Sequence, residues 1–442
     1  MAEQERLPTT KKEWHQRVLF LAWPIILSNL SIPLVGAVDT AVVGQLSHPR
    51  FMAAVAIGAI IFSSTFWIFG FLRMGTTGFV SQAYGRDDDR QVSLAFFRAG
   101  LIALVLGGLF ILLQKPIAWL AFHFIGAEPD VLLLAEEYYA IRVWSAPATF
   151  LNYCILGVLI GMQRMRLVLL TQLVLNGCNI ALDIAFVNGL GMDVDGVALS
   201  SLLSEYIAVL FGLWLLRKQL FYLREIVLSD IVQLDALKAL FVVNGNLFLR
   251  TLLLMSAFYF FTAQGARFGT VVLAANAVLI NMLHFLAYGL DGFAQAAEAL
   301  VGGAYGKKQR QTFHTAVKVS SLWAFIMAVL IALLYAAFGE NFIRTLTSIE
   351  EVINIANEYR YWLVLAPIVA VWSYQFDGIY IGATQTKVMR DTMAISLIIY
   401  IISAYVLMHY FDNHGLWAAL MIFLLMRGIT MAMHYPRLLN RL

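Results

Sequence analysis

Long apolar runs dominate this sequence, and each must be buried either in a membrane or in a protein core. A helix needs roughly 20 residues to cross the hydrocarbon layer of a bilayer, which is about 30 Å thick. Twelve runs are long enough: 15–45, 52–83, 93–116, 129–160, 166–188, 194–216, 237–266, 272–303, 314–338, 350–382, 388–410 and 413–436. Because 61% of the residues are hydrophobic and only 13% are charged, a single water-facing core could not bury them all. The sequence therefore predicts an all-α integral membrane protein with twelve transmembrane helices.

The second half of the chain repeats the first at a constant shift of 221 residues. Ala83-Tyr84-Gly85-Arg86 returns as Ala304-Tyr305-Gly306-Lys307, and Glu137-Tyr138 returns as Glu358-Tyr359. The same shift links Tyr153, Gly157, Ile160 and Gly161 to Tyr374, Gly378, Ile381 and Gly382. One offset across separated stretches indicates that a six-helix unit was duplicated. Repeated halves around a central site are a common plan among membrane transporters.

The repeat predicts an N-terminal six-helix lobe at 1–216, a more polar cytoplasmic linker at 217–236 and a C-terminal six-helix lobe at 237–442. The basic residues of the loops collect on one side of the predicted membrane. The loops on the other side carry only Arg50, Arg267 and Arg344. Basic loops stay cytoplasmic, so we expect both termini to lie inside the cytoplasmic membrane. Six spans per lobe then give the two lobes the same orientation, which makes the repeat parallel and the bundles pseudo-symmetric.

Several function classes are disfavoured by what the sequence contains. The net charge of +3 is small, so we expect no nucleic-acid partner. Cys154 and Cys178 lie in apolar stretches and are interpreted as buried thiols, with no metal site. Residues 302–307 resemble a phosphate-binding loop, but the glycine spacing is one residue short and no hydroxyl residue follows the lysine. We therefore expect neither an enzyme nor a cofactor, and no ATP-driven transport by this chain.

Acidic and amide residues inside the predicted spans of the first half point to an ion-coupled site, because charges there are costly. Asp39 lies in the first span. Asp183 lies in the fifth, with Asn179 four residues and Asn176 seven residues before it, all on one helical face. An aspartate among amides and hydroxyls can hold a proton when poorly hydrated and ionise when a cation is near. The alternative is that these groups only join helices. Glu205 in the sixth span has the same two interpretations, with a cytoplasmic-side arginine as its structural partner.

The second half carries its polar residues at other positions. Asp291, Gln295 and Glu298 are spaced four and three residues apart, which again places them on one helical face. Asp377 lies in the tenth span, and Arg250 in the seventh span is its natural counter-ion. Two interpretations remain open: a direct role of these acids in transport, or a neutral Arg250–Asp377 pair with a structural role.

Pro24 and Pro33 interrupt the hydrogen bonding of the first span and predict a bend near Asp39. The bend is interpreted either as a static kink that fits the neighbouring helices or as a point of proton-dependent movement.

Motifs along nearly the whole chain resemble the multidrug and toxic compound extrusion (MATE) family, in its DinF branch. They are Pro24 fifteen residues before Asp39, Phe71-Leu-Arg73-Met-Gly-Thr-Thr77-Gly, Gln82-Ala-Tyr84-Gly85, Trp144-Ser-Ala-Pro147-Ala, Asn179-x-x-x-Asp183, Leu290-Asp291-Gly-Phe293-Ala-x-Ala-x-Glu298 and Leu-Trp417-x-Ala-Leu. The resemblance implies two six-helix lobes arranged as a V and cation-coupled export of organic, often cationic, compounds. It also implies a cation network of Asp39, Tyr138, Asn179, Asp183 and Ser201. Tyr139 adjoins Tyr138, and relatives often have threonine at the position of Ser201.

The NorM branch of that family has a cation site in the second lobe, with an acid on the seventh helix. This sequence has no acid there and keeps only Asp377 of such a site. At the repeat shift, Asp39 corresponds to Phe260, Asn179 to Tyr400 and Asp183 to Ala404. We therefore expect coupling in the first lobe, and substrate contact or charge balance in the second.

The sequence favours a proton-coupled exporter of small organic compounds that works as a monomer in membrane lipid, with sodium as the alternative coupling ion. A second hypothesis is a flippase for lipid-linked precursors. It requires a strongly basic cavity, for which Arg73 and Arg250 are the candidates.

Overall fold

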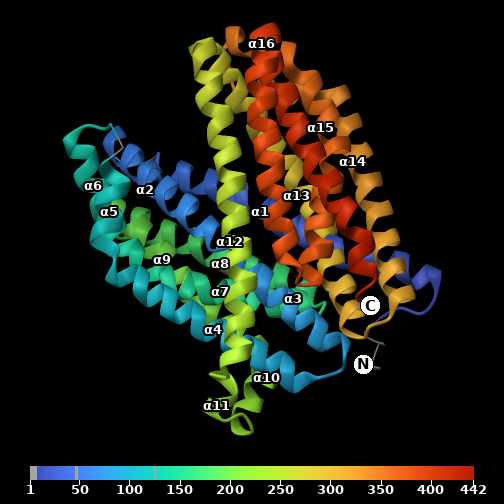
Figure 1. Ribbon diagram of the computed structural model, residues 1–442. Coiled ribbons are helices and arrows are strands. Elements are labelled where there is room, and N and C mark those ends of the chain that lie inside the picture. The colour runs from blue at the N-terminus through green and yellow to red at the C-terminus, as the bar shows by residue number, and fades with distance from the viewer. Residues whose placement is uncertain (1–6, 45–47, 124–125) are drawn as a thin grey trace. The chain divides into compact units, whose positions relative to one another are not determined.

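The computed structural model describes residues 7–44, 48–123 and 126–442, and helices and loops account for all of them (Figure 1). Side chains at several positions near the end of α1 (Lys11–Val43), Asp39 among them, lie outside this description. Ten helical stretches of the described chain are long and apolar enough to cross a membrane. α1 covers the first expected span, and α16 (Thr386–Leu439) holds the last two on either side of a backbone break at Asp412. The twelve-helix expectation is therefore confirmed.

The remaining helices follow the expected order. In the first half they are α2 (Pro49–Ile68), α3 (Phe71–Gly85), α4 (Asp89–Leu112), α5 (Gln114–His123), α6 (Pro129–Arg142), η1 (Val143–Ser145), α7 (Ala146–Gly161), α8 (Met165–Asp183), η2 (Ile184–Gly189) and α9 (Val194–Leu215). Between the halves lie α10 (Arg217–Phe221), η3 (Tyr222–Arg224) and α11 (Leu228–Ile231). In the second half they are α12 (Leu234–Gly265), η4 (Ala266–Phe268), α13 (Thr270–Gly306), α14 (Arg310–Leu346), α15 (Glu350–Gly382) and α16.

α1 begins with a capping box. The backbone N–H groups of Thr9 and Thr10 donate to Oε2 of Glu13 at 3.0 and 3.3 Å, and the Glu13 N–H donates to Oγ1 of Thr10. The Thr9 and Thr10 N–H bonds lower the pKa of the Glu13 carboxyl. These contacts fix the start of the first span at a polar turn.

The backbone φ angles also repeat at the shift of 221 residues. Asp87 and Lys308, which are 221 residues apart, adopt φ angles of 60° and 52°. Gln163 and Thr384, at the same separation, adopt 60° and 54°. Residues other than glycine seldom adopt a positive φ. Each of these four residues turns the chain directly after a helix, so the two halves share the same turn geometry at matching positions.

Contacts group the chain into two compact units that do not coincide with the sequence halves. One, here called the C-terminal unit, comprises Met1–Ile26, Ser81–Asp87 and Phe241–Leu442. The other, the N-terminal unit, comprises Leu27–Val80 and Asp88–Leu240. α1 therefore passes from one unit to the other two residues after Pro24. The boundaries expected from the repeat, at 216 and 237, stay a prediction.

Within the C-terminal unit, α13 to α16 pack side by side (Figure 1, yellow to red). Glycines permit the closest contact: a Cβ on Gly382 of α15 would lie 2.9 Å from N of Gly302 and 3.3 Å from C of Glu298 on α13. A Cβ on Gly378, one turn earlier, would meet the backbone of Ala294. The end of α3 joins this packing, because Nε2 of Gln82 donates to the carbonyl of Gly382 at 2.9 Å.

Gly382→Ala is therefore expected to destabilise the protein by about 1–3 kcal/mol, because the added methyl group forces α13 and α15 apart. Thermal unfolding of the purified protein measures the effect. Gly245→Ala serves as the control, since a Cβ there meets no atom within 4 Å. Equal stabilities of the two variants would contradict the close packing.

In the N-terminal unit, the segment between the repeats is held against α4. Nη2 of Arg98 donates to the carbonyl of Asp230 at 2.6 Å, and Arg90 forms a 2.7 Å ion pair with the Asp230 carboxylate. The segment predicted as a linker thus contains short helices and is attached to α4 near its C-terminal end.

Candidate functional site

The expected polar face of α8 meets α9 in a buried cluster. Asp183 is 0% exposed and Asn179 is 7% exposed. The hydroxyl of Ser200 donates to Oδ1 of Asp183, and Nδ2 of Asn179 donates to the hydroxyls of Ser200 at 3.3 Å and Ser201 at 3.4 Å. The structure therefore brings together Asn179, Asp183 and Ser201 of the expected network, and adds Ser200 at its centre.

Ser200 has two acceptors within reach of one hydroxyl proton. Besides Asp183, its Oγ lies 2.9 Å from the carbonyl oxygen of Val197 on the preceding turn of α9. A hydroxyl group donates one hydrogen bond and accepts others. Ser200 can thus donate to an ionised Asp183, or accept from a protonated Asp183 while donating to Val197. The site is hydrogen-bonded in both protonation states without a change of side-chain positions.

Asn176, on the same face of α8, contacts α1. Its Nδ2 donates to Oγ of Ser31 at 2.8 Å, and Ser31 in turn donates to the carbonyl of Ser28. Asp39 lies two turns further along α1. Its side chain is outside the part of the chain that the structure describes, so its place in the network stays a prediction. Pro24 is buried, and α1 continues as a helix through it.

The two neighbouring tyrosines of α6 are both buried and both contact α2. A Cβ on Gly58 would lie 2.8 Å from Cε1 of Tyr138, and the Tyr138 ring lies 6.3 Å from the Phe62 ring. Tyr139 stacks on Phe62 at 5.2 Å and donates its hydroxyl to the carbonyl of Gln114 at 3.1 Å. Because Tyr139 is held by α5 at its polar end, Tyr138 remains the candidate for the cation network.

Glu205 forms a separate polar group deeper along α9. Its Oε2 accepts from Nδ2 of Asn152 at 2.8 Å, and its Oε1 lies 4.0 Å from Nη2 of Arg142. Arg142 is the last residue of α6, within the fourth expected span, so the partner is an intramembrane arginine and not one at the cytoplasmic end of α9. These contacts favour the structural interpretation of Glu205.

The C-terminal unit contains the expected Arg250–Asp377 ion pair, and a second arginine joins it. Arg427 of α16 also donates to Oδ2 of Asp377 at 2.8 Å, beside the bond from Nη2 of Arg250. Arg427 is 3% exposed and Asp377 8% exposed. Two guanidinium groups therefore share one carboxylate oxygen, and the trio carries one excess positive charge. The pair itself is neutral, and the excess charge comes from Arg427.

The other polar residues of the second half lie on α13. Asp291 interacts electrostatically with Tyr288 on its own helix and with Tyr374 on α15. Tyr374 also lies under the guanidinium of Arg427, 6.0 Å from ring centre to Cζ. Gln295 is half-buried, and Glu298 is 1% exposed. The carboxyl group of Asp291 therefore belongs to the surroundings of the two arginines.

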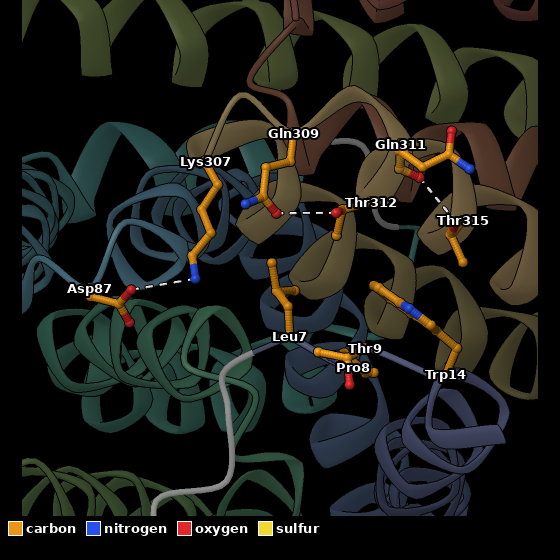
Figure 2. A pocket seen from close by; sticks show the side chains of 10 residues that line it. All are labelled: Leu7, Pro8, Thr9, Trp14, Asp87, Lys307, Gln309, Gln311, Thr312 and Thr315. Carbon is orange, nitrogen blue, oxygen red and sulfur yellow. Dashed lines mark hydrogen bonds and ion pairs between the residues drawn. The ribbon is translucent and has the colours of Figure 1, made fainter. Parts of the chain in front are cut away.

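A polar cavity of about 530 Å³ opens in the C-terminal unit at the end of α13 (Figure 2). Lys307 reaches across to Asp87 at 3.4 Å, and the first turn of α14 contributes Gln309, Gln311 and Thr312. Leu7, Pro8, Thr9 and Trp14 of the chain start form another wall. Its lining residues include none of the described members of the Asn179–Asp183 cluster.

No metal centre is present among the residues that the structure describes, where no three histidine, cysteine or acidic side chains come together. Cys154 and Cys178 are free thiols; Cys154 is buried as expected, whereas Cys178 is half-buried.

Comparison with known proteins identifies the family. The MatE family model matches twice, at residues 24–185 and 247–406, once in each half of the repeat. The chain belongs to the MATE family. This is a family of membrane transporters, so the chain is a multi-pass transporter and not an enzyme. The double match also agrees with the duplication deduced from the 221-residue shift.

Individual relatives place the chain more closely. DNA damage-inducible protein F of Escherichia coli is 39% identical over 429 residues, which are 97% of this chain and 92% of the relative. That similarity confirms the DinF branch. The human multidrug and toxin extrusion protein 1 is 25% identical over 86% of this chain and 65% of its own length.

Solved structures confirm the fold. A multidrug resistance MATE family transporter in an outward-facing conformation matches with a TM-score of 0.87 at 21% identity, over 97% of this chain and 96% of its own. MATE structures described as straight and as bent each match with a TM-score of 0.86 at 20% identity; the straight one covers 97% of both chains and the bent one 98%.

Sequence reasoning missed several residues of these clusters. Arg142 and Arg427 lie inside the expected spans 129–160 and 413–436, and a count of every charge within the spans would have found them. Ser31 and Asn152 carry no such signal, because a single serine or asparagine in an apolar helix is common. Ser200 was missed because the family resemblance implies the hydroxyl role for its neighbour Ser201.

Proposed function

We propose that this transporter exports small organic compounds, often cationic and amphipathic, in exchange for protons. The N-terminal lobe (1–216) carries the coupling site, the segment 217–236 links the lobes on the cytoplasmic side, and the C-terminal lobe (237–442) contributes charge balance and substrate contact. The observation that supports coupling is the buried Asp183, whose partner Ser200 is hydrogen-bonded in either protonation state. The similarity to transporters named for multidrug extrusion and resistance supports the substrate class.

The coupling step follows from those contacts. In the outward-open state of the transporter, a proton binds Oδ1 of Asp183 and the new O–H donates to Oγ of Ser200. The Ser200 hydroxyl then turns to donate to the carbonyl of Val197. The cluster loses one negative charge and no hydrogen bond. A cationic substrate loses its counter-charge and leaves, while α1 rearranges near Pro24, where it passes between the compact units. Return to the inward-open state releases the proton to the cytoplasm. Asp39 shares this role, and Tyr138, Asn179 and Ser201 complete the network.

The energy available from one proton is sufficient. A membrane potential supplies about 2.3 kcal/mol per 100 mV, and each pH unit adds about 1.4 kcal/mol. A total of about 4 kcal/mol supports a gradient of several hundred-fold for a neutral substrate exchanged one-for-one. For a monovalent cation the two charge movements cancel, so the pH gradient alone supports about a tenfold gradient per pH unit.

Sodium is the second candidate for the coupling ion, because carboxylate, amide and hydroxyl oxygens also suit it. Purified protein in vesicles decides between the ions when proton and sodium gradients are imposed separately. Dye accumulation that follows the proton gradient supports the proposal. Dye accumulation that follows only the sodium gradient would identify sodium, and not the proton, as the coupling ion.

We place the protein in the cytoplasmic membrane as a monomer with both termini inside, following the distribution of basic loop residues. The flippase alternative requires arginines that are free to bind phosphate. Arg142, Arg250 and Arg427 each lie within ion-pair distance of a buried carboxylate, which disfavours it.

Ser200→Ala tests the hydrogen-bond exchange. The ionised Asp183 loses a donor, so its charged form is less stable and it takes up a proton at higher pH. Protonated Asp183 also loses its acceptor, but a hydrogen bond to a charged group is worth about 1 kcal/mol more than a neutral one, so half-maximal export is expected to move up by about one pH unit. Ser204→Ala, one turn away on the same helix, is the control, because its hydroxyl bonds to the carbonyl of Ser201. An unchanged pH profile in Ser200→Ala would contradict this step.

A further inference from the structure

The last two spans are joined by an unusual backbone break. Asp412 interrupts α16 with φ 47° and ψ −128°, a conformation that residues other than glycine seldom adopt. Asn413, directly after it, is buried and exchanges two hydrogen bonds with Asn276 of α13, at 2.8 and 3.0 Å. Nε1 of Trp417 also donates to Oδ1 of Asn276 at 2.9 Å. The start of the last span is thus anchored to α13, and the strained residue sits just before the anchor.

His414, the next residue, connects this joint to α15 through both of its ring nitrogens. Nδ1 accepts a hydrogen bond from Nε1 of Trp362 at 3.1 Å, and Nε2 lies 3.4 Å from Oε1 of Glu358. An indole nitrogen only donates. Nδ1 must therefore be unprotonated in this arrangement, which leaves the proton of the neutral ring on Nε2, facing Glu358. The His414 side chain is 45% exposed, so it exchanges protons with water.

We propose that His414 is a proton-operated latch on the joint between the last two spans. When His414 is neutral, both of its contacts to α15 are satisfied. A second proton must go to Nδ1, where two N–H donors would then face each other, so the bond to Trp362 breaks. The bond from Nε2 to Glu358 gains charge and strengthens. Protonation therefore breaks the contact at Trp362 and strengthens the existing one at Glu358, one turn nearer the start of α15, and Asp412 takes up the change in backbone angle.

The groups around His414 come from α15 and α16. From α15 these are Glu358, Trp362 and Tyr359, whose ring centre lies 4.7 Å from that of His414. Asp412 contributes a further carboxylate from α16 itself, and it interacts electrostatically with Tyr359. Both charged groups are acidic, and Glu358 lies within ion-pair distance of the imidazole. Imidazole is the side chain that ordinarily titrates between about pH 5 and pH 8.

The latch faces outward in the topology proposed above, and this part of the inference rests on that proposal. A matched control exists at the opposite end of the same unit. Nε1 of Trp323 on α14 donates to Nδ1 of His15 on α1, also at 3.1 Å. His15 lies near the start of α1, on the cytoplasmic side. A proton gradient should therefore act on the two histidine–tryptophan pairs separately.

The test follows the indole N–H signals of the full chain, labelled with ¹⁵N-tryptophan, in nanodiscs from about pH 8 to about pH 5. Trp362→Phe and Trp323→Phe assign the two signals. The Trp362 signal is expected to move toward the position of an indole without a hydrogen-bond acceptor as His414 takes up its proton. In His414→Asn the side-chain oxygen accepts from Trp362 at all pH values, so the shift is expected to disappear. A Trp362 signal that stays constant, or that moves equally in His414→Asn, overturns the latch.

A spin-label pair on exposed sites of α15 and the last span measures the joint itself. One hydrogen bond is lost, so the population of the rearranged joint is expected to change about fivefold over the same pH range. No change in wild type would overturn the latch even if Trp362 responds.

Transport separates this inference from the coupling proposal. His414→Asn in vesicles is expected to keep proton-driven export, because Asp183 is intact, and to lose only the dependence of the rate on external pH. A full loss of export in His414→Asn would assign the histidine to coupling and contradict a latch. A His414 response to internal instead of external pH would reject the proposed orientation and leave the latch standing.

Discussion

Asp183→Asn is expected to abolish proton-driven accumulation of substrate while leaving the fold intact. Asparagine has the same shape as a protonated aspartate, and its amide oxygen still accepts from Ser200. The variant cannot release or take up a proton, so the driving force of about 4 kcal/mol is lost and the several-hundred-fold gradient collapses to near unity. Dye accumulation in vesicles under an imposed proton gradient measures the effect.

Asp195→Asn is the matched control for that variant. Asp195 lies on the neighbouring helix α9, and its carboxylate accepts from the backbone N–H groups of Asp193 and Gly196 at the start of that helix. Export by this control is expected to stay near the wild-type level. Gradient-driven accumulation by Asp183→Asn would show that the coupling proton binds elsewhere. Asp39→Asn, tested beside it, then decides whether the first span carries the proton alone.

The helices could be predicted from the sequence because a span depends on local composition. The spacing of Asn179 and Asp183 placed both on one face of α8, since helical periodicity is also local. The partner on α9 could not be derived in this way. Ser200 and Ser201 differ by one residue, which turns the side chain by about 100° around a helix, and the rotation of α9 against α8 depends on packing along both helices.

Charge pairs between distant spans escaped prediction for a related reason. Asp377 and Arg427 are 50 residues apart, and Arg250 is 127 residues from Asp377. Which arginine meets which carboxylate depends on helix neighbours that a single sequence does not specify. The break at Asp412 was expected only as a boundary between two spans. The hydropathy pattern cannot indicate the hydrogen bonds between Asn276 and Asn413 that fix the chain directly after it.

Asp377→Asn is expected to destabilise the protein by about 3–5 kcal/mol, because it leaves Arg250 and Arg427 buried together without their shared carboxylate. Arg427→Met removes the excess positive charge and leaves one neutral ion pair, so its cost is expected to be smaller. Thermal unfolding of the two purified variants gives the order: wild type and Arg427→Met close together, and Asp377→Asn well below both.

That order separates charge balance from coupling at Asp377. A coupling carboxylate is protonated once in every cycle, so its site must be stable with a neutral side chain. Asparagine at such a site would then leave the stability of the protein unchanged and abolish transport. A carboxylate that accepts from two buried arginines instead balances their charge, and its loss leaves both cations uncompensated in a low-dielectric site. Asp377→Asn with wild-type stability and no proton-driven export would move the coupling site to the C-terminal lobe. Low stability, with export surviving in Arg427→Met, would leave Asp183 and Asp39 as the carboxylates that cycle.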